Sequence, residues 1–178
     1  MVEEAALVST ENGLVPQGEG WYVVNARESR WLENEEFGSY CHFEGDVRFS
    51  GLGINLSILG QGQPACMYHG ESEQEGFLVL AGECLLLVEG EERPLRAWDF
   101  FHCPPWTEHV VVGAGSGQCL ILAVGGRAPE SAVRYPVVDV ALKHAAGVRK
   151  ETNTGKEAYA GVSEEAERPY REGDLPSW

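Results

Sequence analysis

Basic residues are scarce in this chain. It contains 13 lysines and arginines against 28 aspartates and glutamates, which gives a formal net charge of −15 over 178 residues. A surface of this sign repels the phosphate backbone of nucleic acids and the anionic face of membranes. We therefore expect neither nucleic acid nor a membrane among the partners of this protein.

Long hydrophobic runs and secretory features are also missing. No apolar stretch approaches the roughly 20 residues that a membrane-spanning helix needs. The stretch MVEEAALVSTENG has no basic region and no long apolar core, so no signal peptide is expected. The five cysteines are an odd number with no C-x-x-C spacing, and several lie in apolar strand-like runs. This usage favours a reducing, cytoplasmic location.

The chain shows no internal repeat and no alternation of strands with helices, which a parallel sheet would require. From residue 52 onward, short β-forming runs are instead separated by turn signals about every 8–12 residues. These runs are LGINLSIL, GFLVLAG, ECLLLVEG, DFFHCPPW, EHVVVGAGSG and QCLILAVGG. They predict an all-β sandwich or barrel, and the chain length suits a single domain.

We divide the chain into three segments. Residues 1–20 are predicted to be a loose acidic arm, and residues 21–126 a β-barrel whose core is 52–125. Residues 127–178 are predicted to form a short helix and an extended tail. A tail without structure would have few aromatic residues, so we expect this one to pack on the barrel or on a neighbouring subunit.

Two features of the last segment support this division. A helix is expected around Val138–Ala146, with Asp139 near its start and Gly147 near its end. The aromatic residues that argue for a packed tail are Tyr159, Tyr170 and Trp178.

Four side chains form a candidate metal site: His69, Glu71, Glu75 and His109. His69 and Glu71 lie two residues apart in an extended run, so they point to the same face. A short bend lets Glu75 turn back toward that face, and His109 opens a later strand after a proline turn. Two histidines and two carboxylates can bind one divalent transition metal such as Mn²⁺, Fe²⁺, Zn²⁺ or Ni²⁺.

The same segment resembles the cupin superfamily, in particular its single-domain, RmlC-like members. Its first motif, G-x5-H-x-H-x3-4-E-x6-G, is matched by Gly62, His69, Glu71, Glu75 and Gly82. The second motif, G-x5-P-x-G-x2-H-x3-N, is matched in DFFHCPPWTEHVVVG by Pro104 and His109. The resemblance covers about residues 52–125 and implies a double-stranded β-helix, or jelly-roll barrel, that forms a homodimer.

The sequence departs from these motifs at several positions. Glu71 stands where most metal-binding cupins have a second histidine, and the interval from Gly62 to His69 is one residue longer. Trp106 takes the place of a turn glycine, and Gly113 that of the asparagine. With two carboxylates the loaded site is neutral, which makes the metal a weaker Lewis acid than in a three-histidine site.

The resemblance implies either an enzyme or a binding module. A metal-dependent dioxygenase, isomerase or decarboxylase would act on a small oxygen-rich molecule, whereas a non-catalytic module would only hold a small ligand or a metal. A transcription regulator is disfavoured because no helix-turn-helix is found. Candidates for lining the pocket are Tyr68, Phe77, His102 and Trp106.

Simpler interpretations remain open for most of these residues. His69 and His109 could be hydrogen-bonded core histidines of a metal-free barrel, and Glu71 could point to solvent and leave three ligands. His102 is more simply a packing residue, and Cys103 an inert buried thiol. Residues expected at the surface are Glu73, His42 and His144, while Trp98 and Trp106 are either core or pocket floor.

Overall fold

The computed structural model describes residues 1–176, so the predicted packing of Trp178 lies outside it. The strands are β1 (Ala6–Thr10), β2 (Gly13–Gln17), β3 (Trp31–Asn34), β4 (Gly38–Cys41), β5 (Leu52–Leu59), β6 (Gly70–Glu71), β7 (Glu75–Ala81), β8 (Glu83–Val88), β9 (Glu91–Arg96), β10 (Phe100–Cys103), β11 (His109–Ala114), β12 (Cys119–Gly126), β13 (Val133–Arg134) and β14 (Ala166–Arg168). The helices are α1 (Asp139–Lys143) and α2 (Gly155–Ala158).

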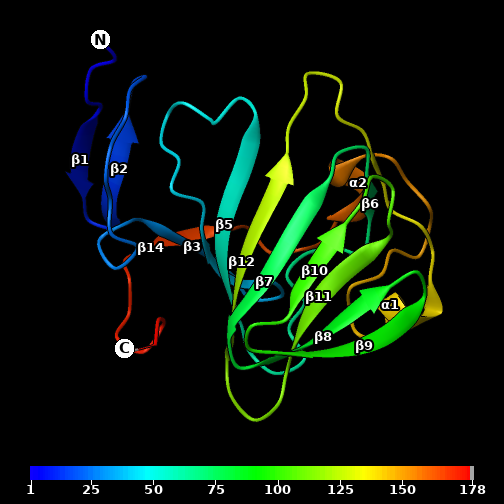
Figure 1. The fold of residues 1–178 in the computed structure, drawn as a ribbon. Helices are drawn as coiled ribbons and strands as arrows, with labels where there is room; N and C mark the ends of the chain where they lie inside the picture. The colour runs from blue at the N-terminus through cyan, green and yellow to red at the C-terminus, as the bar shows by residue number, and fades with distance from the viewer. Residues whose placement is uncertain (177–178) are drawn as a thin grey trace.

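Two antiparallel sheets face each other and enclose the main core. The larger has seven strands in the order β10-β7-β12-β5-β4-β3-β14, and the smaller has three in the order β11-β8-β9. Figure 1 shows the larger sheet through the middle of the molecule and the smaller one at its right. The buried residues between the sheets are Leu59, Val79, Cys84, Leu86, Val111, Cys119 and Ile121. The predicted all-β barrel is therefore confirmed.

The strand runs predicted from residue 52 onward correspond closely to β5, β7, β8 and β10–β12, and the exposed strand β9 was not among them. The reason is local: each run alternates side chains between the core and the outside, and a turn ends it. Gly82, between β7 and β8, has φ 76°. A side chain there would lie 2.4 Å from the Gln118 carbonyl oxygen, so this turn requires glycine.

The N-terminal third differs from the prediction. Residues 6–17 form the β1–β2 hairpin rather than a loose arm, and it stands apart at the left of Figure 1. The run WYVVNA at 21–26 forms no named strand, whereas the acidic stretch after it forms the β3–β4 hairpin. Polar composition was misleading because a few apolar residues are enough to anchor β3 and β4, whose Trp31 and Cys41 are buried in one cluster.

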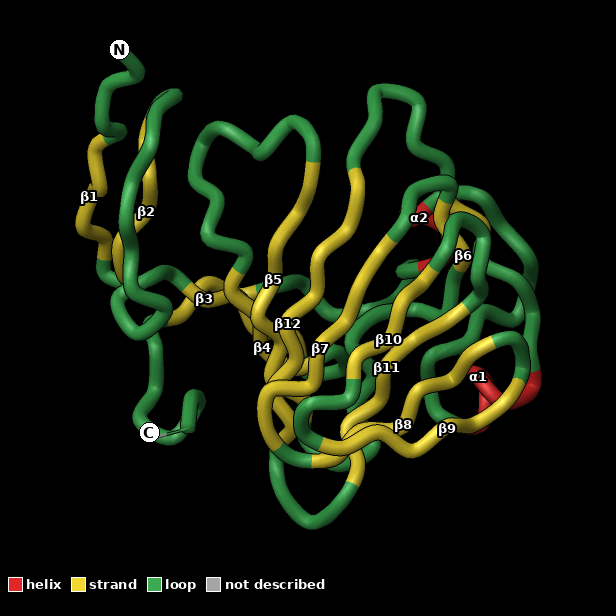
Figure 2. The backbone as a smooth tube through the Cα atoms, in the orientation of Figure 1, coloured by secondary structure: helices red, strands yellow, loops and turns green. Residues whose placement is uncertain are grey.

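The C-terminal segment packs on its own barrel. β13 pairs with β6, and β14 extends the larger sheet by pairing with β3. The predicted helix is present as α1 but is shorter than Val138–Ala146. In Figure 2 the chain around α1, α2 and β6 is mostly loop, so this side of the barrel is covered by irregular structure.

An ion pair between buried Glu44 and partly exposed Arg127 fastens the loop between β4 and β5 to the end of β12. The Glu44 carboxylate contacts the Arg127 guanidinium at 2.5 Å and also accepts a hydrogen bond from the Phe49 amide. Burial raises the pKa of Glu44, but Arg127 and the Phe49 amide lower it by more, and the net pKa lies below the usual value. The pair therefore stabilises the loop while Glu44 is ionised.

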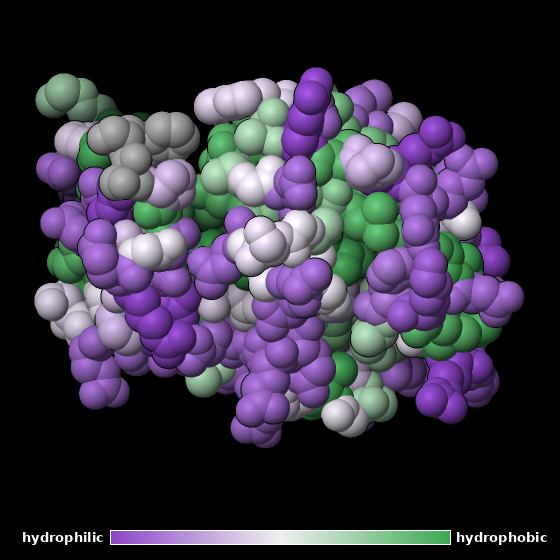
Figure 3. Space-filling model, turned by 90° about the horizontal axis from the view of Figure 1, so that it is seen from below, coloured by the Kyte–Doolittle hydropathy of each residue, from purple (hydrophilic) through white to green (hydrophobic). Residues whose placement is uncertain are grey.

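Hydrophilic side chains cover much of the surface, as the view from below in Figure 3 shows, with hydrophobic patches between them. Among residues 1–176, neither helix has the length and hydrophobicity that a membrane span requires.

Candidate metal centre

The two candidate histidines lie directly opposite each other on neighbouring extended segments. The backbone amide of His69 donates to the His109 carbonyl at 3.1 Å, and the His109 amide donates to the His69 carbonyl at 2.8 Å. Side chains of such a cross-strand pair project to the same side. The ring centroids are 5.1 Å apart, so residues 40 positions apart in the sequence meet at one point.

Both rings are held in the same tautomer. His69 Nδ1 lies 2.7 Å from the Met67 carbonyl oxygen, and His109 Nδ1 lies 3.0 Å from the Thr107 carbonyl oxygen. A carbonyl only accepts hydrogen bonds, so each Nδ1 must carry the proton. Each Nε2 then points into the site, and a bound ion would take the lone pair of that nitrogen in place of a proton.

Glu75, the first residue of β7, places its carboxylate against His109. Glu75 Oε2 is 3.3 Å from His109 Nε2, yet this buried oxygen has no hydrogen-bond partner among the described residues. Gly125 on the neighbouring strand β12 leaves the space, because a side chain there would come within 3.3 Å of Glu75 Oε1. A buried carboxylate without a partner is costly.

A cation would resolve this arrangement. When only Nδ1 carries a proton, His109 presents an acceptor nitrogen to the acceptor oxygen of Glu75, and a positive ion between them would turn the contact into an attraction. One ligand atom each from His69, Glu75 and His109 lies within 4.8 Å of the others. The donor set and the orphaned oxygen therefore both fit a divalent metal.

Glu71 lies at the rim of this cluster. Its Oε1 is 3.3 Å from His69 Nε2, and its side chain is 35% exposed. The His69 hydrogen bond lowers the pKa of Glu71 more than burial raises it. Burial lowers the pKa of His69, but Cys66, Glu71 and the Met67 carbonyl raise it well above the usual value. The predicted Glu71 ligand thus faces the site but is not part of the tight cluster of three.

Two of the four predicted pocket residues do not line the site. Tyr68 is fully buried in a separate cluster with Leu87 and Val110, and its hydroxyl accepts a hydrogen bond from the Gly90 amide. His102 is exposed on the opposite face of β10, because its neighbours in the strand point inward. Both residues were assigned to the wrong face, because successive side chains of an extended segment point to opposite sides.

The other two lie close to the metal centre. The Phe77 ring is 5.1 Å from His109 and forms an apolar wall. Trp106 is 52% exposed beside the mouth, and its amide donates to the Glu71 carbonyl. Its φ of 66° is the left-handed conformation of the glycine that it replaces, so the turn is kept at the cost of strain.

Two thiols touch the histidines on the side away from the cluster. Cys103 Sγ is 3.3 Å from His109 Nδ1, and Cys66 Sγ is 3.7 Å from His69 Nδ1. Burial and the nearby Glu75 raise the pKa of Cys103 to about 12, so it stays a neutral thiol, as predicted. The contact between Cys103 and His109 was not predicted from the sequence. Cys103 lies two residues after the inward-facing Phe101 on the same strand, so its side chain points to the same face.

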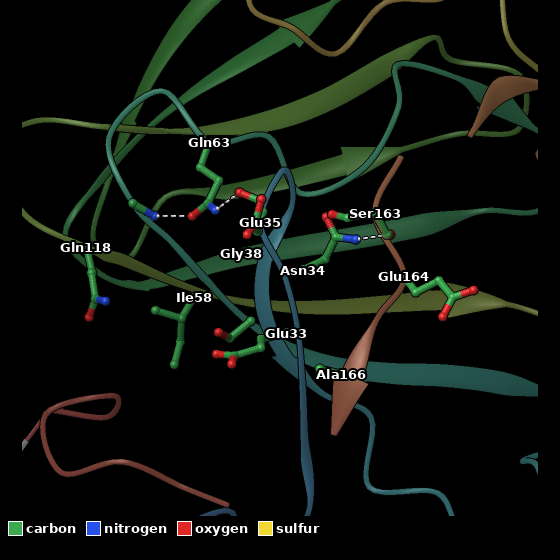
Figure 4. A pocket seen from close by; sticks show the side chains of 12 residues that line it. Glu33, Asn34, Glu35, Gly38, Ile58, Gln63, Gln118, Ser163, Glu164 and Ala166 are labelled. Atoms are coloured by element: carbon green, nitrogen blue, oxygen red, sulfur yellow. Dashed lines mark hydrogen bonds between the residues drawn. The ribbon is translucent and has the colours of Figure 1, made fainter. Parts of the chain in front are cut away.

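The remaining histidines and a second hollow lie elsewhere. His144 pairs with Glu92, and His42 is partly buried beside Glu44. A groove of about 510 Å³ lies against β3 and β4. Figure 4 shows that its amides are already bonded, Asn34 to the Ser163 carbonyl and Gln63 to the Gly60 amide. These two amides are therefore not available to a ligand without loss of a bond.

The part of the chain that builds the metal centre also matches a known family. Residues 56–125 match the family model for the cupin domain. This part of the chain is a cupin domain. This cupin domain contains β7–β12 and all four predicted ligands. No curated protein sequence matches the chain.

Solved structures with a similar fold support this assignment. A sugar phosphate isomerase of the cupin superfamily from Silicibacter pomeroyi is 26% identical, with a TM-score of 0.51, and the alignment covers 57% of this chain and 66% of that one. The chain thus spans just under two thirds of that protein. A cupin 2 conserved barrel protein from Salinispora arenicola is 20% identical over 62% of this chain and 92% of its own, with a TM-score of 0.50.

A third structure shares only the fold. The polyketide cyclase from Streptomyces resistomycificus is 14% identical over 62% of this chain and 84% of its own, with a TM-score of 0.51. The predicted jelly-roll architecture agrees with these structures.

Proposed function

We propose that this cupin is a metal-dependent enzyme that isomerises a small polyhydroxylated molecule. The observation that carries the metal is the buried Glu75 Oε2, which faces His109 Nε2 without a hydrogen-bond partner. Isomerisation is favoured over dioxygenase or decarboxylase chemistry because the similar structure from Silicibacter pomeroyi is a sugar phosphate isomerase. The substrate of this chain is part of the proposal.

His69, Glu75 and His109 would hold the ion, with Glu71 as the fourth ligand at the solvent side. A bound divalent metal would polarise the carbonyl and hydroxyl oxygens of the substrate. Two carboxylates favour harder ions such as Mn²⁺ or Fe²⁺. Phe77 closes the wall next to His109 and excludes water from that side.

Glu71 is also placed to move a proton. Its Oε1 faces His69, which leaves Oε2 for the substrate, and its side chain is partly open to solvent. Its lowered pKa keeps it ionised near neutral pH. Glu71 Oε2 would take the proton from the carbon next to the substrate carbonyl and return it to the carbonyl carbon, while the proton of the adjacent hydroxyl passes to the former carbonyl oxygen.

Elemental analysis of protein purified without added metal tests the metal centre. We expect near-stoichiometric Mn, Fe, Zn or Ni in the wild type and a loss of at least about tenfold in Glu75→Gln and His109→Ala. Glu73→Gln and His102→Ala are matched controls, because Glu73 bonds to Ser72 and His102 is exposed on the other face of its strand. Equal metal content in all five proteins would contradict the assignment.

Activity separates an enzyme from a binding module. Loaded protein is incubated with aldose and ketose pairs, with and without a phosphate group, and the interconversion is followed by NMR. An oxygen-uptake assay with the same compounds tests dioxygenase chemistry. Metal binding without turnover of any of them would favour the non-catalytic module.

We also propose that the protein is a homodimer. The outward residues of the larger sheet near the site carry no charge, although the whole chain carries −15. They border a groove of about 550 Å³ that the metal-site residue Glu75 also lines, whereas Tyr170 and Leu175 of the same chain pack at the far end of this face. An uncharged face lets two acidic molecules approach. The residues at the near end are Leu52, Leu78, Phe100, Leu122 and Val124.

Analytical ultracentrifugation tests the dimer. Phe100 is 65% exposed on this face, so Phe100→Asp is expected to give monomers at micromolar concentration. Val23, which is 80% exposed and does not line this groove, provides the control variant Val23→Asp. A monomeric wild type would contradict the proposal.

A further inference from the structure

The segment beyond the cupin domain reaches the metal centre through Met67. The Met67 amide donates a hydrogen bond to the Tyr159 hydroxyl at 3.1 Å, and the Met67 carbonyl accepts one from His69 Nδ1 at 2.7 Å. Both polar backbone groups of Met67 are therefore in use. The Tyr68 amide, which shares a peptide unit with the Met67 carbonyl, donates to the Ala146 carbonyl at 2.7 Å. Met67, and with it the proton position on His69, is therefore held from two points beyond the cupin domain, Ala146 and Tyr159, which is 92 residues away in the chain.

Tyr159 is itself held firmly. Its ring packs edge-on against Phe37 at 5.4 Å and against Tyr135 at 6.1 Å. Tyr135 in turn lies 5.8 Å from the His69 ring. Burial is the main cause that raises the pKa of Tyr159, so its hydroxyl stays neutral and available as an acceptor.

The His109 side has no such support. Its Nδ1 is bonded to Thr107, whose amide donates to the Pro104 carbonyl at 3.2 Å within the same tight turn. All of these groups belong to residues 56–125, which match the cupin domain. The two histidines are thus fixed by different parts of the chain.

We propose that Tyr159 is a positioning residue of the metal centre, which holds Met67 so that His69 presents Nε2 to the ion. This inference rests on the proposed metal site. The hydroxyl touches neither metal nor substrate and acts through the Met67 backbone. Loss of a group that orients a metal-binding histidine typically weakens metal affinity by about 10–100-fold.

The test variant is Tyr159→Phe, which removes one hydroxyl and keeps the ring. Tyr170→Phe is the matched control, since the Tyr170 hydroxyl lies at the surface and accepts a hydrogen bond from Arg27. In metal-free protein, ¹⁵N chemical shifts of the imidazole nitrogens report the tautomer of each histidine. We expect a mixed tautomer for His69 in Tyr159→Phe, with His109 unchanged and the control like the wild type.

Calorimetric titration with Co²⁺ gives the second readout. We expect a Kd about tenfold weaker in Tyr159→Phe and an unchanged Kd in Tyr170→Phe. An unchanged His69 tautomer would overturn the positioning role, even if the metal binds. A wild type that binds no metal would instead overturn the proposed function, and the tautomer measurement would still decide whether Tyr159 orients His69.

A second variant, Phe37→Leu, tests the same proposal if Tyr159→Phe folds poorly. Phe37→Leu leaves the Tyr159 hydroxyl in place but removes a ring that supports it. We expect a partial shift of the His69 tautomer and a smaller loss of Co²⁺ affinity. A His69 resonance identical to that of the wild type in this variant would count against the proposal.

Discussion

The two halves of the metal centre are built in different ways. His109 and Glu75 come from regular strands of the cupin domain, and the Thr107 carbonyl within a tight turn orients the His109 ring. His69 lies in an irregular extended segment, and its orientation depends on Met67, Tyr135 and Tyr159. The barrel half is local and rigid, whereas the other half depends on packing of the C-terminal segment.

Part of the metal centre therefore depends on residues outside the cupin domain. The family model stops at residue 125, yet Tyr135 and Tyr159 lie beyond it. The cupin domain provides the ligands, and the segment after residue 125 orients one of them, His69. Perturbations should therefore affect the two halves unequally.

The largest effect on stability is expected where the last strand of the C-terminal segment is anchored. Trp31 is fully buried, and the Arg168 guanidinium lies 5.5 Å from its ring. We expect Trp31→Ala to lower the free energy of unfolding by about 3–5 kcal/mol, because it opens a cavity. Urea denaturation measures this. Trp21→Ala, at a site that is 52% exposed, is expected to cost no more than about 0.5 kcal/mol.

Next in size is the difference between the two carboxylates. Glu75 is buried within the tight cluster, whereas Glu71 lies at the rim. We expect Glu75→Gln to weaken Co²⁺ binding about 100-fold and Glu71→Gln about tenfold. Calorimetric titration of both variants measures the ratio. Equal losses would show that the rim ligand is as important as the buried one.

A pH titration examines the ion pair that fastens the loop between β4 and β5. The folded-state pKa of Glu44 is lower than its unfolded value, so the unfolded state binds the proton more readily. The stability that the pair contributes is present above about pH 4.3, the ordinary value for Glu. It is lost as the pH falls through the lowered folded pKa. Chemical denaturation between neutral and acid pH should show this loss.

The matching variant removes the titration. In Glu44→Gln the free energy of unfolding should be lower at neutral pH and should depend less on pH in the acid range. An acid slope as steep as that of the wild type would show that other carboxylates are responsible.

The smallest expected effect concerns the turn beside the metal centre. Trp106 has a φ of 66°, a conformation that costs an L-residue about 1–2 kcal/mol. We expect Trp106→Gly to stabilise the fold by up to about 1 kcal/mol, after the entropy cost of glycine is subtracted. Urea denaturation measures this, and Trp21→Gly should instead destabilise because its φ is not left-handed.

Local sequence signals predicted much of the barrel. The strands β5, β7, β8 and β10–β12 could be predicted from alternation and glycine turns, and the candidate ligands from the spacing of His69, Glu75 and His109. The β1–β2 hairpin also carried a signal that composition obscured, since Asn12-Gly13 is a strong hairpin turn. Its acidic surroundings led to the prediction of a loose arm.

Other features had no local signal. Tyr68 and His102 lie within regular apolar patterns, and only the packing shows that Tyr68 faces a different cluster and His102 the outside. The roles of Met67 and Tyr159 depend on a contact across 92 residues. Residue type and spacing do not predict such a contact, because almost any residue can form a backbone hydrogen bond.

The sequence by itself determined an acidic all-β chain with a histidine and carboxylate set, because strand period, turn glycines and side-chain chemistry act over a few residues. The tertiary structure alone decided which oxygen is left without a partner, and which distant tyrosine reaches the Met67 amide. Those outcomes depend on how segments far apart in the chain pack against each other, and packing is a property of the whole fold.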